Sequence, residues 1–521
     1  MTNPNPISKE LIVGLEAARN SKDVRQQQHD AESKVHVVGA GGTLTAAYEQ
    51  LRNAAEYTEE HVLLQHAIRR FYKRLFLLRN ASYIARSGED LVIELTQAGY
   101  VQNDTIPETT VQIISSLASS YFKAYSDLEK SRRVSRRQLD QWTYELLAIE
   151  IEWLLHDSSQ LQAFTQFAHL YLLKTLDFKQ LFATQPPDTE TALYVAIHRA
   201  LLKSDEAVVR LGLLKRYQQS LGDLKQYITL NKHIDTLFDS ATTEKLFRII
   251  DRRGAPLRVL RHMIDDDPSL GQTISNKEQF LAVYEKQVVD DYQSINQRVN
   301  KGIIRSVIFL IITKFLIGLA IEIPYDYVIR GAILWLPLLI NLAFPPVYML
   351  LLRATLMLPG SANTKRLVAQ IERIIYGDLD AKQLQRQRPP SFSVAYNIAY
   401  GLAFVLVFGG VGWLLFSTFG FDLLHLAIFF IFLSGASFLG FRLSRMIREL
   451  ESIETHQNGI TTVRDFLYMP FVVVGRYMSD KYSQVNIVAL ALDMLIELPL
   501  KTTLRLIRQW AAFISSKKDE L

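Results

Sequence analysis

Residues 303–323 read IIRSVIFLIITKFLIGLAIEI, and three further apolar stretches of similar length follow before residue 442. They are GAILWLPLLINLAFPPVYMLLL at 331–352, residues 394–416 and residues 423–441. A transmembrane helix needs about 20 mostly apolar residues to cross about 30 Å of hydrocarbon, and buried helices of soluble proteins rarely run so long with so few charges. No comparable stretch occurs in residues 1–300. We therefore expect an all-α, polytopic membrane protein with four transmembrane helices and a large helical N-terminal domain in the cytoplasm.

The composition of the whole chain agrees with an average over a membrane part and a soluble part. Of the 521 residues, 49% are hydrophobic and 21% are charged, and the mean hydropathy is +0.06. These values exclude a disordered or collagen-like chain. The absence of cysteine excludes disulfides, iron–sulfur clusters, thiolate zinc sites and cysteine nucleophiles. A net charge of +5 is too small for this length to indicate nucleic-acid binding.

Lysine and arginine gather on one side of the four stretches. They precede the first stretch, fill the connection between the second and third, and follow the fourth, as Arg298, Lys301, Arg305, Arg353, Lys365, Arg366, Arg373, Lys382, Arg386, Arg388, Arg442, Arg445 and Arg448. Because cytoplasmic loops retain Lys and Arg, we expect both termini and the central loop in the cytoplasm. The polar first 44 residues lack a signal-peptide pattern, so the simplest location is the bacterial inner (cytoplasmic) membrane.

The chain divides into segments on this basis. They are a flexible polar tail (1–44), a cytoplasmic helical domain (45–273), a long juxtamembrane helix running into the first span (274–323), the spans 331–352, 394–416 and 423–441, a basic cytoplasmic loop (353–393) and a cytoplasmic amphipathic region (442–521). Within the domain, apolar periodicity predicts helices near 57–78, 108–130, 138–156, 159–173, 190–203, 205–220 and 242–264. Strand-like alternation occurs only at 34–38.

A long continuous helix is predicted before and through the first span. Ser275 and Glu278 form a capping-box pattern, and no proline follows up to Ile323. The helix would have about 47 residues and a length near 70 Å. An apolar stripe at coiled-coil-like spacing runs along its first half, as Leu281, Val288, Tyr292, Ile295 and Val299. This stripe packs either on the chain's own helical domain or on a second subunit.

Charged and helix-breaking residues within the spans are the main candidates for a functional site. Lys314 lies near the middle of the first span, where a charge is costly and marks a functional site by default. Glu322 and Asp326 lie towards the outer end of that span and are expected to pair with Lys314 only in part. In the second span, Asn341 precedes Pro345 and Pro346, which are expected to break the helix and free carbonyl groups. The alternative to a functional role for Lys314 is a structural lysine that faces a polar interior between helices.

Two basic clusters are candidates for contact with anionic lipid. One lies between predicted helices of the domain and contains Arg132, Arg133, Arg136 and Arg137. The other lies on one face of an amphipathic helix at 500–514 and contains Lys501, Arg505 and Arg508. A solvated loop for the first cluster, and ordinary packing beneath the spans for the second, are the alternatives.

The remaining motifs point to no catalytic chemistry. The segment VVGAGGT at 37–43 lacks the third glycine of a dinucleotide fingerprint and no βαβ series follows it, so we interpret it as a hinge. The acidic run 265–267 before Pro268 is interpreted as a capping turn rather than a cation site, and the final KDEL as a coincidence. No histidine metalloprotease, P-loop or serine-hydrolase pattern occurs, so we expect no enzyme, no cofactor and no metal.

Two stretches resemble those of uncharacterised bacterial multi-span membrane proteins. They are YEQLRNAAEYTEEHVLLQHAIRRFYKR at 48–74 and LPLLINLAFPPVYMLLL at 336–352. The layout of a cytoplasmic helical domain, four spans and an amphipathic C-terminal segment is also similar. The resemblance implies a membrane protein of this layout, but it implies no activity, cofactor or site residue.

The leading hypothesis is a non-enzymatic membrane protein that anchors a helical scaffold or partner-binding domain at the membrane. The alternative is an oligomeric transporter or channel that uses Lys314 and a helix break at Pro345 and Pro346. A membrane enzyme with an unfamiliar site is a third hypothesis. The expected contacts are the lipid bilayer, an unknown cytoplasmic protein and a second copy of the chain, but no nucleic acid.

Overall fold

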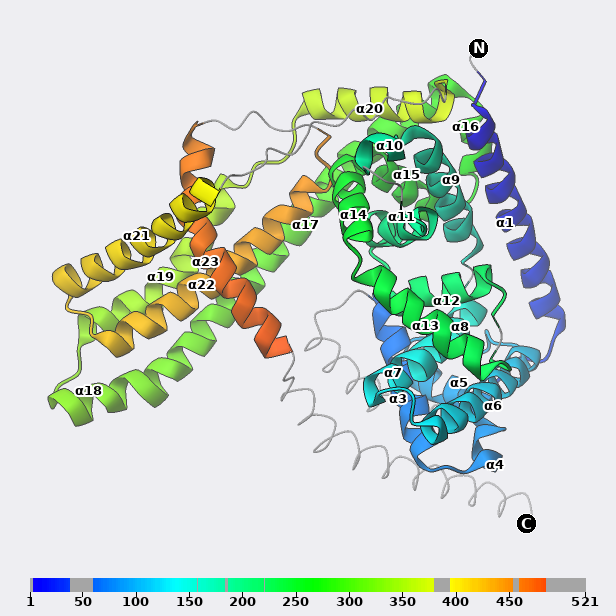
Figure 1. The fold of residues 1–521 in the computed structure, drawn as a ribbon, viewed down its shortest axis with the longest axis horizontal. Coiled ribbons are helices and arrows are strands. Elements are labelled where there is room, and N and C mark those ends of the chain that lie inside the picture. Colours follow the sequence, from blue (N-terminus) through cyan, green and yellow to red (C-terminus); the bar gives the residue numbers. More distant parts are fainter. Residues whose placement is uncertain are drawn as a thin grey trace.

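The computed structural model describes residues 3–37, 60–156, 158–182, 186–219, 221–378, 394–452 and 459–483. Within these ranges every regular element is a helix, and the only pairing of extended backbone is an isolated bridge between Lys34 and Pro107. Figure 1 shows a large helical domain on the right and a bundle of long helices on the left, joined by one long helix, α17. The prediction of an all-helical chain is confirmed for these ranges.

The helical domain packs around two apolar cores. Its elements are α1 (Pro6–Ala31), α3 (Glu60–Leu77), α4 (Ala81–Ile84), α5 (Ser87–Gln97), α6 (Glu108–Ser131), α7 (Arg136–Asp140), η1 (Gln141–Glu145), α8 (Leu146–Leu155), α9 (Ser159–Thr175), α10 (Phe178–Leu181), α11 (Thr189–Ile197), η2 (His198–Leu202), α12 (Glu206–Arg216), α13 (Leu224–Phe238), α14 (Ala241–Arg253), α15 (Ala255–Asp266) and α16 (Leu270–Ile274). One core lies among α3, α5, α6, α8, α12 and α13 and contains Tyr72, Phe76 and Trp142. The other contains Phe164 and Phe167 of α9 together with residues of α1, α11, α14, α15 and the start of α17.

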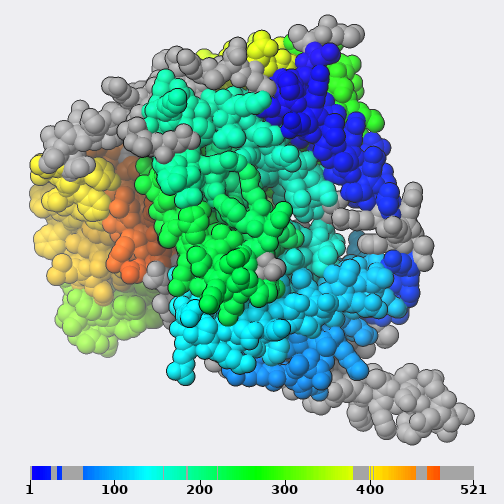
Figure 2. Space-filling view, turned by 45° about the vertical axis from the view of Figure 1, so that its right-hand side comes forward, coloured from blue at the N-terminus to red at the C-terminus, as the bar shows by residue number. Residues whose placement is uncertain are grey.

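Helix α1 corrects the prediction that residues 1–44 form a flexible tail. Asn5 caps the helix, because its side chain accepts a hydrogen bond from the Ser8 amide at 2.9 Å. Leu11 is buried in the core that contains α9, and Figure 2 shows α1 in blue lying against the side of the domain. The buried apolar residues of α1 lie in its first half and its second half is mostly polar, so the segment as a whole resembles a polar tail in the sequence.

The predicted helix at 242–264 is two helices. Pro256 has no amide hydrogen to continue the helix from α14, so the chain turns at Gly254 and α15 begins with the proline in its first turn. A side chain at Gly254 would meet the Ile250 carbonyl oxygen at 2.7 Å, so the turn also depends on glycine.

Helix α17 (Lys277–Ile317) joins the domain to the bundle. It begins at Asn276, whose side chain accepts from the Gln279 amide, and this corrects the predicted capping box of Ser275 and Glu278. The helix continues through a π-helical turn, η3 (Gly318–Glu322), into α18 (Ile323–Arg330). The continuous helical rod is 54 residues long, which confirms the predicted long helix and extends it beyond Ile323.

The apolar stripe on the first half of α17 packs within the chain. Tyr284, Val288 and Tyr292 are buried in the domain core that contains α9, and Leu281 and Ile295 pack against its edge. Further along the same helix, residues of α17 enter the core of the bundle. One helix is therefore shared by the domain and the bundle.

Four helices are long and apolar enough to cross a membrane. They are the rod that contains α17 and α18, α19 (Trp335–Thr355), α21 (Val394–Phe419) and α22 (Leu423–Arg448). In α21 the part that could span a membrane is Tyr400–Phe419. The outer faces of the bundle carry large apolar side chains such as Phe309, Phe315 and Trp413, each at least half exposed in the isolated chain. Such a surface is typical of helices that face lipid.

The predicted basic loop at 353–393 contains a helix, α20 (Ser361–Tyr376). Leu367, Ile371 and Ile375 of α20 are fully buried in the domain core beside α17. Residues 379–393 of the same segment lie outside the described residues. The correction has a simple cause, because basic residues on the outer face of an amphipathic helix resemble a charged loop in the sequence.

Helix α23 (Gly459–Ser483) is the described part of the predicted C-terminal region. It packs on the middle of α22 rather than apart from the spans. The two helices are so close there that a Cβ at Gly475 would lie 2.1 Å from the Ser434 carbonyl oxygen. Phe471 of α23 also stacks against Phe430 of α22, and Figure 1 shows α23 crossing the bundle. The predicted amphipathic helix at 500–514 lies outside the described residues.

Candidate functional site

A buried ion pair lies within the bundle. Lys314 Nζ is 2.6 Å from Glu322 Oε1, and the two side chains are 1% and 0% exposed. The ammonium group also lies 4.9 Å from the centre of the Phe432 ring of α22. The pair is complete and hydrogen-bonded, so the prediction that Lys314 and Glu322 pair only in part is wrong.

The π-helical turn η3 brings this pair together. Residues eight apart in a regular α-helix point about 80° away from each other, because each residue turns the helix by about 100°. A π-helical turn accommodates one extra residue, so Glu322 takes the orientation that the preceding residue would have in a regular helix. Glu322 therefore lies two turns beyond Lys314 on the same face, towards α19 and α22.

Asn341 connects the ion pair to α22. Its Nδ2 donates to Glu322 Oε1 at 3.3 Å and to the backbone oxygen of His425, also at 3.3 Å. Asn341 is fully buried on α19, so it links the first, second and fourth spans through one amide group.

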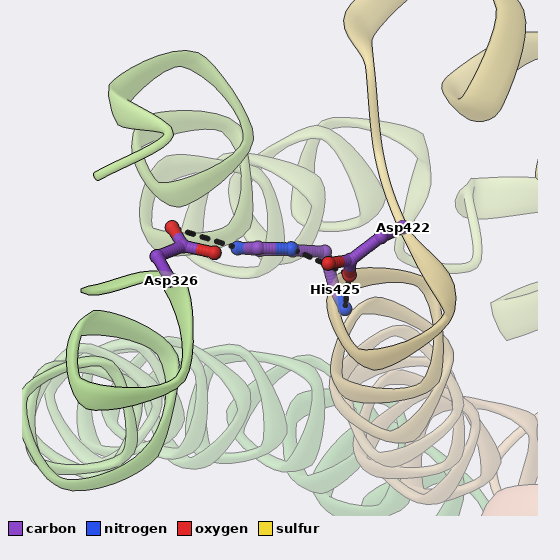
Figure 3. A group of neighbouring side chains, drawn as sticks. All are labelled: Asp326, Asp422 and His425. Atoms are coloured by element: carbon purple, nitrogen blue, oxygen red, sulfur yellow. Dashed lines mark hydrogen bonds and ion pairs between the residues drawn. The ribbon is translucent and has the colours of Figure 1, made fainter. Parts of the chain in front are cut away.

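A second charged group lies at the end of the bundle formed by the short connections 331–334 and 420–422, which we call the short-loop end. Figure 3 shows the imidazole of His425 between the carboxylates of Asp326 and Asp422. His425 Nδ1 is 2.8 Å from Asp422 Oδ1, and Nε2 is 3.6 Å from Asp326 Oδ2. Asp422 caps α22 by accepting from the His425 amide, and Asp326 Oδ2 accepts from the Leu334 amide at 2.9 Å.

Several polar atoms of this network have no hydrogen-bond partner among the described residues. The buried atoms without a partner include Glu322 Oε2, Asp326 Oδ1, Asn341 Oδ1 and His425 Nε2. Burying a polar atom without a partner costs about 1–3 kcal/mol, so four such atoms close together are unusual in a structure. The three oxygens are acceptors, and His425 Nε2 is one when the ring hydrogen is on Nδ1, so a cation or protons would satisfy these atoms.

The two prolines of the second span do not break the helix. Pro345 and Pro346 lie inside the continuous helix α19, and both are buried. Their missing amide hydrogens leave the carbonyl groups of Asn341 and Leu342 without their usual helical donors. The predicted helix break is therefore wrong, although the predicted loss of backbone hydrogen bonds holds.

The structure thus brings together most of the predicted membrane residues and adds others. Lys314, Glu322 and Asn341 form one connected group, while Asp422 and His425 were not identified as site residues from the sequence. The available signal was Asp422 followed three residues later by His425 at the start of a span, a spacing that places both on one face of a helix.

The predicted lipid-contact residues are only partly described. Arg132, Arg133, Arg136 and Arg137 are exposed around the junction of α6 and α7, and Arg136 lies 3.7 Å from both Glu129 and Asp140. Lys501, Arg505 and Arg508 lie outside the described residues. The same holds for the glycine-rich segment from residue 38 onward and for the final KDEL.

The helical domain contains titratable groups with altered pKa values. Burial raises the pKa of Glu152 to about 7, although its hydrogen bond with Gln65 opposes the shift. Burial, with the nearby charge of Arg261, lowers the pKa of His198 to about 3. A cleft of about 300 Å³ lies near Trp153, and Lys215 lies 4.6 Å from the centre of that ring. Glu152 and Trp153 lie on α8, Lys215 on α12 and His198 on η2.

Comparison of the chain with protein-family models, with curated protein sequences and with solved structures found no match.

Proposed function

We propose that this chain is an integral membrane protein that holds its helical domain in a fixed orientation on the cytoplasmic side of a bacterial inner membrane, where the domain binds a partner protein. The observation that carries this proposal is that α17 belongs to both the domain core and the bundle core. A flexible linker would be enough to tether a domain, whereas a shared helix also fixes its direction.

Contacts at the end of α22 support the same proposal. Arg258 of α15 is buried and its Nη1 donates to the Glu449 backbone oxygen at 2.9 Å. Asn363 of α20 donates to the Leu450 backbone oxygen at 2.8 Å and accepts from the Ser452 amide at 2.9 Å. The domain is therefore attached to the bundle at the last span as well as through the first.

The cytoplasmic orientation rests on charge. Arg298, Arg353 and Arg442 lie at the domain end of the spans, while the short-loop end holds Arg330 close to Asp422. Retention of basic flanks in the cytoplasm would put the domain inside the cell. Fusions of alkaline phosphatase after residue 332 and after Leu521 test this orientation: we expect activity only for the first, and the reverse pattern would overturn it.

Exposed apolar side chains at the corner of α3 and α4 support a partner-binding role. Leu77, Leu78 and Tyr83 are between 58% and 61% exposed, and they follow one another closely in the chain. Such a group on a protein surface often marks a contact with another protein.

The partner-binding proposal is tested by a photoreactive amino acid placed at Tyr83 of the full chain in its native membrane. We expect a crosslink to a separate protein from this position and none from Glu285, an exposed position on α17 that serves as the control. Equal labelling from both positions, or no crosslinked protein from Tyr83, would contradict the proposal.

A second candidate function is transport of an ion by an oligomer, and one observation favours it. The buried ion pair of Lys314 and Glu322 would be costly in a bundle that served only as an anchor. Ion flux through the purified chain in liposomes, abolished in Lys314→Ala, would support transport. The absence of flux in the unaltered chain would leave the anchoring role as the better proposal.

A further inference from the structure

We propose that Asp326 and His425 bind a divalent first-row transition-metal cation such as Zn²⁺ inside the bundle, with Asp422 orienting the histidine. The site lies at the short-loop end of the spans, and Figure 3 shows its three side chains in one row. One ligand atom from each of the three lies within 4.8 Å of those of the other two. The proposal does not depend on the partner-binding role of the helical domain.

The hydrogen bond to Asp422 determines which ring nitrogen is free. Asp422 Oδ1 accepts from the His425 amide at 3.0 Å and lies 2.8 Å from His425 Nδ1, so the ionised carboxylate requires a hydrogen on Nδ1. A neutral imidazole then carries its lone pair on Nε2. A metal-binding histidine usually donates its other N–H to a carboxylate or carbonyl oxygen, and Asp422 occupies that position here.

The free nitrogen points to Asp326 at a separation that suits two ligands of one ion. His425 Nε2 and Asp326 Oδ2 are 3.6 Å apart, which is too long for a good hydrogen bond. Two ligand atoms that each lie about 2.0–2.1 Å from a tetrahedral zinc ion are about 3.4 Å apart. A small adjustment of either side chain would therefore allow both to bind the same ion.

The balance of charge also favours a cation at this place. Glu322 is neutralised by Lys314 at 2.6 Å, and Asp422 lies 3.5 Å from Arg330. Among the described residues Asp326 has no positive partner except His425, although its side chain is fully buried. A buried charge without a partner is strongly unfavourable, and a bound cation would remove this cost.

Unpartnered buried atoms provide the independent indication of a ligand. His425 Nε2 and Asp326 Oδ1 have no hydrogen-bond partner within the part of the chain that the structure describes, and both residues are 0% exposed. An imidazole nitrogen with a carboxylate favours zinc and its neighbours, whereas Mg²⁺ and Ca²⁺ prefer oxygen ligands alone. Water would complete the coordination, since Asp422 is 12% exposed and opens the site to the short-loop end.

The experiment uses the full chain purified in detergent, with any polyhistidine tag removed and metal stripped by chelation. After incubation with Zn²⁺ and desalting, we expect about one zinc per chain and a higher thermal unfolding temperature. The variants His425→Gln and Asp326→Asn should lose both effects. Asp422→Asn should bind zinc about 10- to 100-fold more weakly, because it no longer orients the imidazole.

A matched control is available in the helical domain. His262 Nδ1 lies 2.8 Å from Asp291 Oδ2, so His262→Gln removes a similar histidine–carboxylate pair outside the bundle, and this variant should bind zinc like the unaltered chain. If His425→Gln does not fold, as judged by gel filtration and circular dichroism, the isosteric Asp326→Asn decides the question.

Two results would overturn the proposal. One is a metal-stripped chain that takes up no zinc at neutral pH. The other is zinc uptake that is the same in the unaltered chain and in folded Asp326→Asn.

Discussion

Replacing Lys314 with methionine should destabilise the bundle strongly, because it leaves Glu322 charged, buried and unpaired. Methionine has nearly the volume of lysine, so the packing around α19 and α22 is kept and the loss is mainly electrostatic. Lys314 makes a 2.6 Å ion pair with Glu322 and a cation–π contact with Phe432. Removing one partner of a buried pair costs about 3–5 kcal/mol, so we expect a loss of about 4 kcal/mol in the free energy of unfolding.

The double variant Lys314→Met/Glu322→Gln should recover most of this loss. Glutamine removes the uncompensated charge but keeps an oxygen that accepts from Asn341 Nδ2, the contact that links α19 to Glu322. We expect the double variant to lie within about 1 kcal/mol of the unaltered chain, so Glu322→Gln should recover about 3 kcal/mol in the Lys314→Met background.

The measurement is equilibrium unfolding in mixed micelles of a mild detergent and dodecyl sulfate, followed by tryptophan fluorescence. Thr313→Val is the matched control: Thr313 is the neighbour of Lys314 but bonds only within its own helix, to the Phe309 carbonyl oxygen. It should change the free energy of unfolding by less than about 1 kcal/mol. The reasoning is refuted if Lys314→Met costs less than about 1 kcal/mol, or if the double variant is less stable than the single one.

Three further predictions concern other parts of the chain. Burial raises the pKa of Glu152 to about 7, so the contribution of its protonated form to stability is full below about pH 4.5 and is lost as the pH rises through 7. Glu152→Gln should therefore be about 2–3 kcal/mol more stable than the unaltered chain at pH 8 and equal to it at pH 4.5. Denaturant unfolding at the two pH values measures the difference. Arg258→Met should cost about 3 kcal/mol and speed amide hydrogen exchange near Glu449, because Arg258 bonds both that residue and Asp251 from a buried position; unchanged exchange would refute the role of this contact. Gly475→Ala should separate α23 from α22, since the new Cβ would meet the Ser434 carbonyl oxygen at 2.1 Å. The chain contains no cysteine, so a single Ser434→Cys substitution can be labelled with maleimide. Labelling should be faster when Gly475→Ala is also present.

The elements that could be predicted from the sequence are those governed by length and local pattern. Four long apolar stretches identify the spans because hydrocarbon thickness sets a minimum helix length. The long helix through α17 follows equally from its lack of proline. Helices α1 and α20 were missed because their apolar faces are buried only by contacts with residues far away in the chain, and the two helices also bond each other, from the Asn5 side chain to the Ile374 carbonyl oxygen.

The candidate site could be predicted only in part. A charge in a span is visible in the sequence, so Lys314 and Glu322 were identified, but their full pairing depends on the π-helical turn that no local pattern indicated. His425 and Asp326 are separated by almost a hundred residues, and only the packing of α18 beside the start of α22 brings them together. The sequence pattern therefore indicated a costly charge but not the neighbours that surround it.

The uninterrupted rod through α17 also makes the protein a lever. With 54 residues at about 1.5 Å each, the rod is about 80 Å long, and its first 26 or so residues, about 39 Å, lie on the domain side. Tilting the rod by about 5° at the membrane surface would therefore move its far end by about 3 Å. A change in bilayer thickness, or the binding of a cation inside the bundle, would in this way be converted into a displacement of the domain surface.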